Sequence, residues 1–171
     1  PWGPPTAWFP DAPDIATRLS MSLVGQLGAD TRAAMAERPT TNADAYEAYL
    51  RGNFDAAQRT RDKLQMALTE YQHALALDLS LNAARARLGF VLSLKADFRW
   101  FLPGETFHAT IARGLAAVDS ALASDSSLAD GWFARCSLLW EDYGYGGHRL
   151  NQARAACERA VALEPTKAEF Q

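Results

Sequence analysis

Few residues of this chain have types and spacing suited to chemistry, and they lie far apart along it. The thiols are Cys136 and Cys157, and the imidazoles are His73, His108 and His148. None of the histidines has a cysteine or a second histidine at the spacing typical of metal ligands. We therefore expect surface or loop histidines, and we predict no metal site.

The sequence also lacks a recognisable reaction centre. No Ser/His/Asp or Cys/His arrangement, carboxylate pair or glycine-rich phosphate motif stands out. We interpret Glu141-Asp142 as a helix end and turn. The segment Tyr143-Gly144-Tyr145-Gly146-Gly147 is rich in glycine but lacks the Lys-Ser/Thr ending of a phosphate loop, so we expect a mobile turn. The sequence predicts a protein that is not an enzyme and needs no cofactor.

Charge and hydropathy limit the classes of partner. The formal net charge is −3, the sequence pI is near 5.6 and there is no basic stripe, which argues against nucleic acid. No apolar run reaches the ~18 residues that would span a bilayer, so we predict no membrane partner. The chain does not begin with Met, and we expect it to be a piece of a longer protein. We expect a cytoplasmic location, with the periplasm as the alternative.

Apolar periodicity and capping residues predict helices almost throughout. Thr41-Asn42-Ala43-Asp44 and Ser127-Leu128-Ala129-Asp130 resemble capping boxes, in which a hydroxyl and an acid satisfy free amides. The predicted helices span 43–54, 61–78, 82–97, 105–124, 128–141 and 150–163. Residues 1–13 read as an irregular lead-in or a leftover of recombinant expression. Residues 14–42 read as amino-terminal helices, the remnant of a preceding domain.

An internal echo indicates stacked repeats. Three predicted helices end alike, in Ala74-Leu75-Ala76-Leu77-Asp78, Ala121-Leu122-Ala123-Ser124-Asp125 and Ala160-Val161-Ala162-Leu163-Glu164. Recurrence of one helix type at such intervals is typical of repeat architectures. The predicted fold is an all-α solenoid of about three helix hairpins with extra amino-terminal helices. The hairpins span 43–81, 82–127 and 128–165, and a fourth begins at 166.

These hairpins resemble the tetratricopeptide repeat (TPR), whose signature places W, L, G and Y on a first helix, then A, F and A on a second, then Pro. The positions that carry the resemblance are Gly52, Ala67, Tyr71 and Ala74, then Gly89, Gly114 and Ala121, then Trp132, Cys136, Ala153, Cys157, Ala160 and Pro165. The family leaves about a dozen residues between the small residues of a pair. The gaps are longer here, so we expect extended turns inside each pair.

Small side chains at helix crossings have a physical purpose, because they let two backbones approach closely. Ala67, Gly114 and Ala153 are such expected contacts. Cys136 and Cys157 occupy facing positions of one hairpin. We expect buried free thiols there, and a redox pair is the alternative because the helices cross at that point.

The resemblance implies a partner-binding groove, since the first helix of each pair lines the concave face of a stacked array. The inward positions that could bind a partner are Tyr46, Tyr49, Phe90, Asp130, Phe133 and Trp140. An aromatic groove with a few polar groups suits an extended peptide or an amphipathic helix. The alternative is that these rings fill gaps between neighbouring repeats.

The loop between the third and fourth predicted helices is unusually aromatic. It carries Phe98, Trp100 and Phe101, which are too apolar for a free loop. We expect it to fold back over the first or second helix pair. A contact with another domain or subunit is the alternative.

A narrower likeness concerns the start of the repeats. Pro39-Thr40-Thr41-Asn42-Ala43-Asp44-Ala45-Tyr46, followed by Tyr49-Leu50-Arg51-Gly52, resembles the repeat arrays that follow a TolB-like domain in bacterial signalling proteins. The resemblance implies a regulatory, scaffolding module that binds a protein or peptide. The alternatives are a structural spacer or self-association module and, less favoured, a small-ligand sensor.

Overall fold

A computed structural model describes residues 38–144 and 147–167, and the residues that it describes contain helices and no strand. The expected helices before residue 38 and the expected fourth hairpin lie outside the described residues. The helices are α2 (Ala43–Ala57), α3 (Arg61–Leu77), α4 (Asn82–Asp97), α5 (Phe107–Ser124), α6 (Ala129–Gly144) and α7 (Leu150–Leu163). The all-helical prediction is confirmed for these residues, and each predicted helix is present with its ends shifted by at most a few residues.

Polar side chains set several helix ends. The Oδ1 atom of Asn42 accepts the Ala45 N–H at 3.1 Å, so the N-cap of α2 is Asn42 and not the Thr41 hydroxyl of the predicted capping box. Thr106 does the same for Ala109 at 3.2 Å, so α5 begins at Phe107 and not at the predicted residue 105. The interpretation of Glu141-Asp142 as a helix end and turn is wrong, because α6 continues to Gly144.

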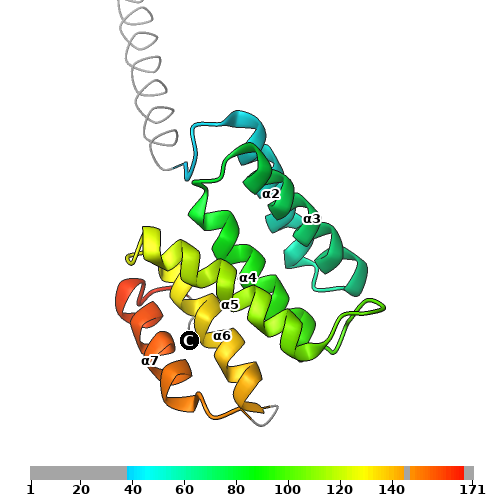
Figure 1. The fold of residues 1–171 in the computed structure, drawn as a ribbon. Coiled ribbons are helices and arrows are strands. Elements are labelled where there is room, and N and C mark those ends of the chain that lie inside the picture. Colours follow the sequence, from blue (N-terminus) through cyan, green and yellow to red (C-terminus); the bar gives the residue numbers. More distant parts are fainter. Residues whose placement is uncertain (1–37, 145–146, 168–171) are drawn as a thin grey trace, which may run out of the picture. The chain divides into compact units, whose positions relative to one another are not determined.

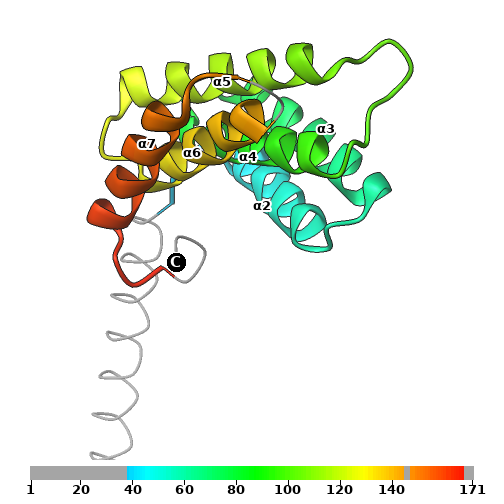
Figure 2. The same ribbon diagram turned by 90° about the horizontal axis from the view of Figure 1, so that it is seen from below.

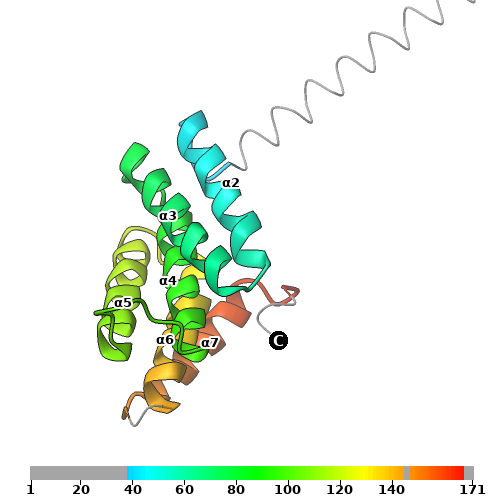
Figure 3. The same cartoon turned by 90° about the vertical axis from the view of Figure 1, so that its right-hand side faces the viewer.

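Consecutive helices pair along the chain. The closest associations are α2 with α3, α4 with α5 and α6 with α7, and these three hairpins follow one another in Figure 1. Between hairpins, α3 packs on α4, and α6 packs on both α4 and α5. Figures 2 and 3 show the same helices from two further directions, with α4 lying between α3 of the first hairpin and α6 of the last.

The core is built from small residues set against large ones. Ala67 and Ala153 are fully buried and Gly114 is buried, so the expected small contacts do face the interior. A Cβ at Gly52 would lie 2.5 Å from the Tyr71 ring, and a Cβ at Gly114 would lie 2.6 Å from Leu138 of α6. Gly114 therefore leaves room for a side chain of the next hairpin.

The aromatic loop at 98–106 lies against the helices. Trp100 and Phe101 are partly buried against the core, and Arg61 at the start of α3 donates to the Phe101 carbonyl at 3.1 Å. Lys95 of α4 is buried and its ammonium lies 2.9 Å from Glu105. The loop thus folds back toward the first hairpin, as expected from its composition.

In the first and last hairpins, polar contacts link the start of the first helix to the end of the second. Thr40 donates to the Asp78 carboxylate at 2.5 Å, which ties the start of α2 to the end of α3. Lys167 lies 2.5 Å from Asp130 and joins the turn after α7 to the start of α6. Among the described helices, none combines the length and the apolar character needed to cross a membrane.

Candidate functional site

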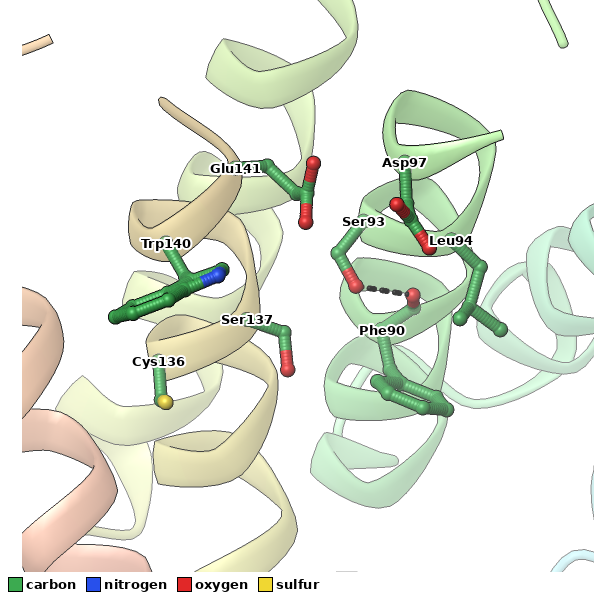
Figure 4. A pocket seen from close by; sticks show the side chains of 8 residues that line it. All are labelled: Phe90, Ser93, Leu94, Asp97, Cys136, Ser137, Trp140 and Glu141. Atoms are coloured by element: carbon green, nitrogen blue, oxygen red, sulfur yellow. Dashed lines mark hydrogen bonds between the residues drawn. The ribbon is translucent and has the colours of Figure 1, made fainter. Parts of the chain in front are cut away.

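A pocket of about 210 Å³ lies between α4 and α6, and we name it the α4–α6 pocket. Both helices are first members of a hairpin, and they pack side by side. The lining residues are Phe90, Ser93, Leu94, Asp97, Cys136, Ser137, Trp140 and Glu141. Two of them, Phe90 and Trp140, belong to the set expected to bind a partner. Figure 4 shows Phe90 at one end of the pocket and Asp97 with Glu141 at the other.

Two aromatic residues line this pocket, and each has a second ring close to it. The Phe90 ring of α4 packs on Phe133 of α6, with ring centroids 5.3 Å apart. Trp140 is 57% exposed, and its ring lies 6.4 Å from that of Tyr143. The Phe90–Phe133 contact fits the reading that some of these rings fill the gap between hairpins. Trp140 does not fit that reading, because most of its surface faces solvent.

The two expected tyrosines form a second aromatic group on the first hairpin. Tyr46 stacks near Tyr49 with centroids 6.4 Å apart, and Tyr49 lies 6.2 Å from Tyr71. The buried Tyr71 hydroxyl donates to Asn53 Oδ1 at 2.8 Å. Burial raises the pKa of Tyr71 well above its ordinary value, so this hydroxyl stays protonated.

A polar link connects this tyrosine group to the pocket. Arg87 of α4 donates to Asn53 Oδ1 at 3.3 Å, and its guanidinium carbon lies 6.0 Å from the centre of the Phe90 ring. Tyr71, Asn53, Arg87 and Phe90 thus form one chain of contacts across α2, α3 and α4. The sequence analysis did not single out Asn53 or Arg87. The only signal in the sequence is their place beside small residues. Asn53 directly follows Gly52, and Arg87 comes two positions before Gly89.

The hydroxyl groups of the pocket are already occupied as donors. Ser93 donates to the Phe90 carbonyl at 2.7 Å, and Ser137 donates to the Phe133 carbonyl at 3.0 Å. Burial and the neighbouring charge of Asp97 raise the pKa of Glu141, although Arg99 acts in the opposite direction. The carboxylates of Asp97 and Glu141 therefore carry the chemistry of the pocket.

Asp130 does not line this pocket. Asp130 is in the first turn of α6, and its carboxylate forms an ion pair with Lys167. The Lys167 ammonium also lies 3.4 Å from Glu164. Asp130, which was expected to bind a partner, thus forms an ion pair within the chain. The aromatic residues Phe98, Trp100 and Phe101 also lie outside the pocket, and Phe98 lies 4.5 Å from Trp100 between ring centroids.

The expectation of buried free thiols is wrong. Cys136 and Cys157 form a disulfide between α6 and α7, with Cα atoms 5.1 Å apart. The facing positions of the two residues, inferred from the repeat pattern, bring them within the separation that a disulfide needs. Because Cys136 also lines the α4–α6 pocket, one wall of the pocket is tied covalently to α7.

Within 38–144 and 147–167, no three His, Cys, Asp or Glu residues gather as a metal site would require. His73, His108 and His148 are exposed, as expected from their isolation in the sequence.

Two comparisons with known proteins return nothing similar to this chain: no protein-family model matches it, and no curated protein does.

Proposed function

We propose that this chain is a non-catalytic protein-interaction module that binds a peptide or helix at the α4–α6 pocket. The observation that carries the proposal is Trp140, which is 57% exposed and, with Phe90, lines a pocket between two first helices. Exposed aromatic rings at a concave site are typical of the residues that dominate protein–protein binding energy.

The size of the pocket supports a peptide side chain as the occupant. A pocket for a drug-sized ligand measures about 300–1,000 Å³ and buries most of the ligand. The α4–α6 pocket is smaller, at about 210 Å³, and it opens to solvent along Trp140. A small-ligand sensor would need more enclosure and more converging polar groups, so it is the less favoured alternative.

The arrangement of the helices supports the broader part of the proposal. Three antiparallel hairpins in chain order, with buried small residues at 67, 114 and 153, are what a TPR-like solenoid requires. By its resemblance to arrays that follow a TolB-like domain, we place the module in the regulatory part of a larger bacterial signalling protein. The disulfide favours an oxidising compartment, and thus the periplasmic alternative over the cytoplasmic expectation.

The second candidate function is a structural spacer that self-associates. It is favoured by two exposed apolar residues one turn apart on α2, since Leu50 and Phe54 expose 46% and 70% of their surface. Contiguous exposed apolar surface is a common feature of interfaces. Light scattering distinguishes this candidate from a monomeric binder.

The test is a selection from a random peptide library displayed on phage. We expect wild-type protein to enrich peptides that the Phe90→Ala/Trp140→Ala variant no longer binds. Phe54→Ala is the matched control, because it removes an exposed ring outside the pocket and should leave binding unchanged. Circular dichroism must show equal helicity for all three proteins. Equal binding by the double variant, or no enrichment by wild type, would contradict the proposal.

A further inference from the structure

The α4–α6 pocket joins an aromatic end to an acidic end. Phe90 and Leu94 supply the apolar wall on α4, and Trp140 supplies the rim on α6. Asp97 on α4 and Glu141 on α6 lie at the opposite end, on either side of the opening (Figure 4). An occupant that fills the pocket therefore meets aromatic and apolar side chains at one end and negative charge at the other.

This negative charge is not neutralised within the described residues by an ion pair. The ion pairs among the described residues join other carboxylates to lysine or arginine, and none of these pairs includes Asp97 or Glu141. The basic group that acts on Glu141 is Arg99, whose guanidinium carbon lies 4.7 Å from the centre of the Phe107 ring. Burial and Asp97 outweigh it, so the pKa of Glu141 is raised. A cation placed between the two carboxylates would relieve their repulsion.

Resting on the proposed function, we infer that the pocket takes a lysine or arginine side chain of a partner peptide, with an apolar residue beside it. The methylene stem lies along Phe90 and Trp140, and the cationic head reaches Asp97 and Glu141. Lysine and arginine can bury such a stem against apolar surface while the charged head group stays in a polar environment. A cation near the face of Trp140 gains a further attraction to the ring.

Other peptide chemistries fit less well. An acidic or phosphorylated side chain would meet like charge at Asp97 and Glu141, which is unfavourable. A purely apolar side chain would cover both carboxylates without giving them a partner, and burying an unpaired charge is costly. The charge complementarity of the pocket thus favours a basic residue over either.

The test measures dissociation constants by fluorescence anisotropy for a peptide enriched in the phage selection. We expect the enriched peptides to share a lysine or arginine. Replacing that residue by norleucine, which keeps the stem and removes the charge, should weaken binding about tenfold, equivalent to about 1.4 kcal/mol. Asp97→Asn/Glu141→Gln should lower the affinity for the basic peptide by a similar factor. It should leave the affinity for the norleucine peptide unchanged, because both changes remove the same interaction.

The matched control is Asp44→Asn/Asp62→Asn, which changes net charge equally at exposed positions of α2 and α3. Its affinity for the basic peptide should stay within twofold of that of the wild type. If this control loses as much affinity as Asp97→Asn/Glu141→Gln, the peptide is attracted only by long-range charge and the inference is overturned. Peptides that need Phe90 and Trp140 but tolerate norleucine would also overturn it and leave the proposed function intact. Failure to enrich any peptide, or dimers that the Phe90→Ala/Trp140→Ala change dissociates, would overturn both.

Discussion

Gly89 of α4 lies directly against Val118 of α5, so a Cβ at position 89 would overlap the Val118 Cγ2 methyl. The same Cβ would lie 3.3 Å from the Gly114 carbonyl oxygen, which belongs to helix backbone and cannot move aside easily. The close approach of α4 and α5 therefore depends on the missing side chain.

The first prediction follows from this contact. Gly89→Ala should lower the free energy of unfolding by about 1–3 kcal/mol, because overpacking outweighs the better helix propensity of alanine. Urea denaturation followed by circular dichroism measures it. Gly144→Ala is the control, since nothing lies within 4 Å of a Cβ there, and it should be neutral or stabilising. Equal midpoints for Gly89→Ala and wild type would contradict the packing.

The second prediction concerns the last hairpin. Ala153 of α7 is fully buried, so Ala153→Leu should overpack the crossing and cost about 1–3 kcal/mol. Ala155→Leu adds the same group at an exposed position of α7 and should have little effect. Thermal unfolding of both variants measures the difference. The prediction fails if Ala153→Leu melts at the wild-type temperature.

The third prediction concerns the Cys136–Cys157 disulfide, which closes a loop with a sequence separation of 21. Reduction should lower the free energy of unfolding by about 3 kcal/mol, because the unfolded chain regains the freedom of that loop. Urea denaturation with and without dithiothreitol measures the change. The stability of the Cys136→Ala/Cys157→Ala variant should be the same with and without dithiothreitol. Unfolded protein that reacts with iodoacetamide before any reduction would show that the thiols are free.

The fourth prediction concerns Lys95, whose side chain is only 4% exposed and whose ammonium lies 2.9 Å from Glu105 and 3.2 Å from Gln65. Glu105→Ala should cost about 3 kcal/mol, because it leaves a buried cation without its carboxylate. Lys95→Met keeps the length of the side chain and removes the charge, so it should cost less. Urea denaturation ranks the two variants. A larger loss for Lys95→Met would contradict the assignment.

The fifth prediction is a pH dependence at Glu105. Burial raises its pKa, but the Leu102 N–H and the Lys95 ammonium outweigh burial and hold the pKa below its ordinary value of 4.5. A lowered folded-state pKa stabilises the fold fully above 4.5, and this stability is lost as the pH falls through the folded value. The stability difference between wild type and Glu105→Gln should therefore shrink below pH 4.5. A constant difference down to acid unfolding would contradict the shift.

The helices could be predicted because their signals are local. The sequence predicts a capping pattern at residues 41–44, where Asn42 does supply the side-chain acceptor that begins α2, and Ala67, Gly114 and Ala153 mark the buried faces. The facing positions of the cysteines followed from the same pattern. Their pairing did not, because a free thiol and a disulfide are equally compatible with a buried helix crossing.

Other features depend on contacts between distant parts of the chain and have no local signal. Arg59 and Arg99 adopt positive φ values of 47° and 55°, although neither is the glycine or asparagine that such turns favour. The link from Asn53 to Arg87 needs the hairpins to be in place. Asp130 was expected in the groove, and its pairing with Lys167 could not be read from two residues so far apart.

The covalent bridge between α6 and α7 has a consequence for a nicked chain. It encloses the whole connection between these helices, so one backbone cut there cannot separate the two fragments. The helix that carries Trp140 and Glu141 would stay attached to its neighbour after proteolysis, and only a reductant would release it.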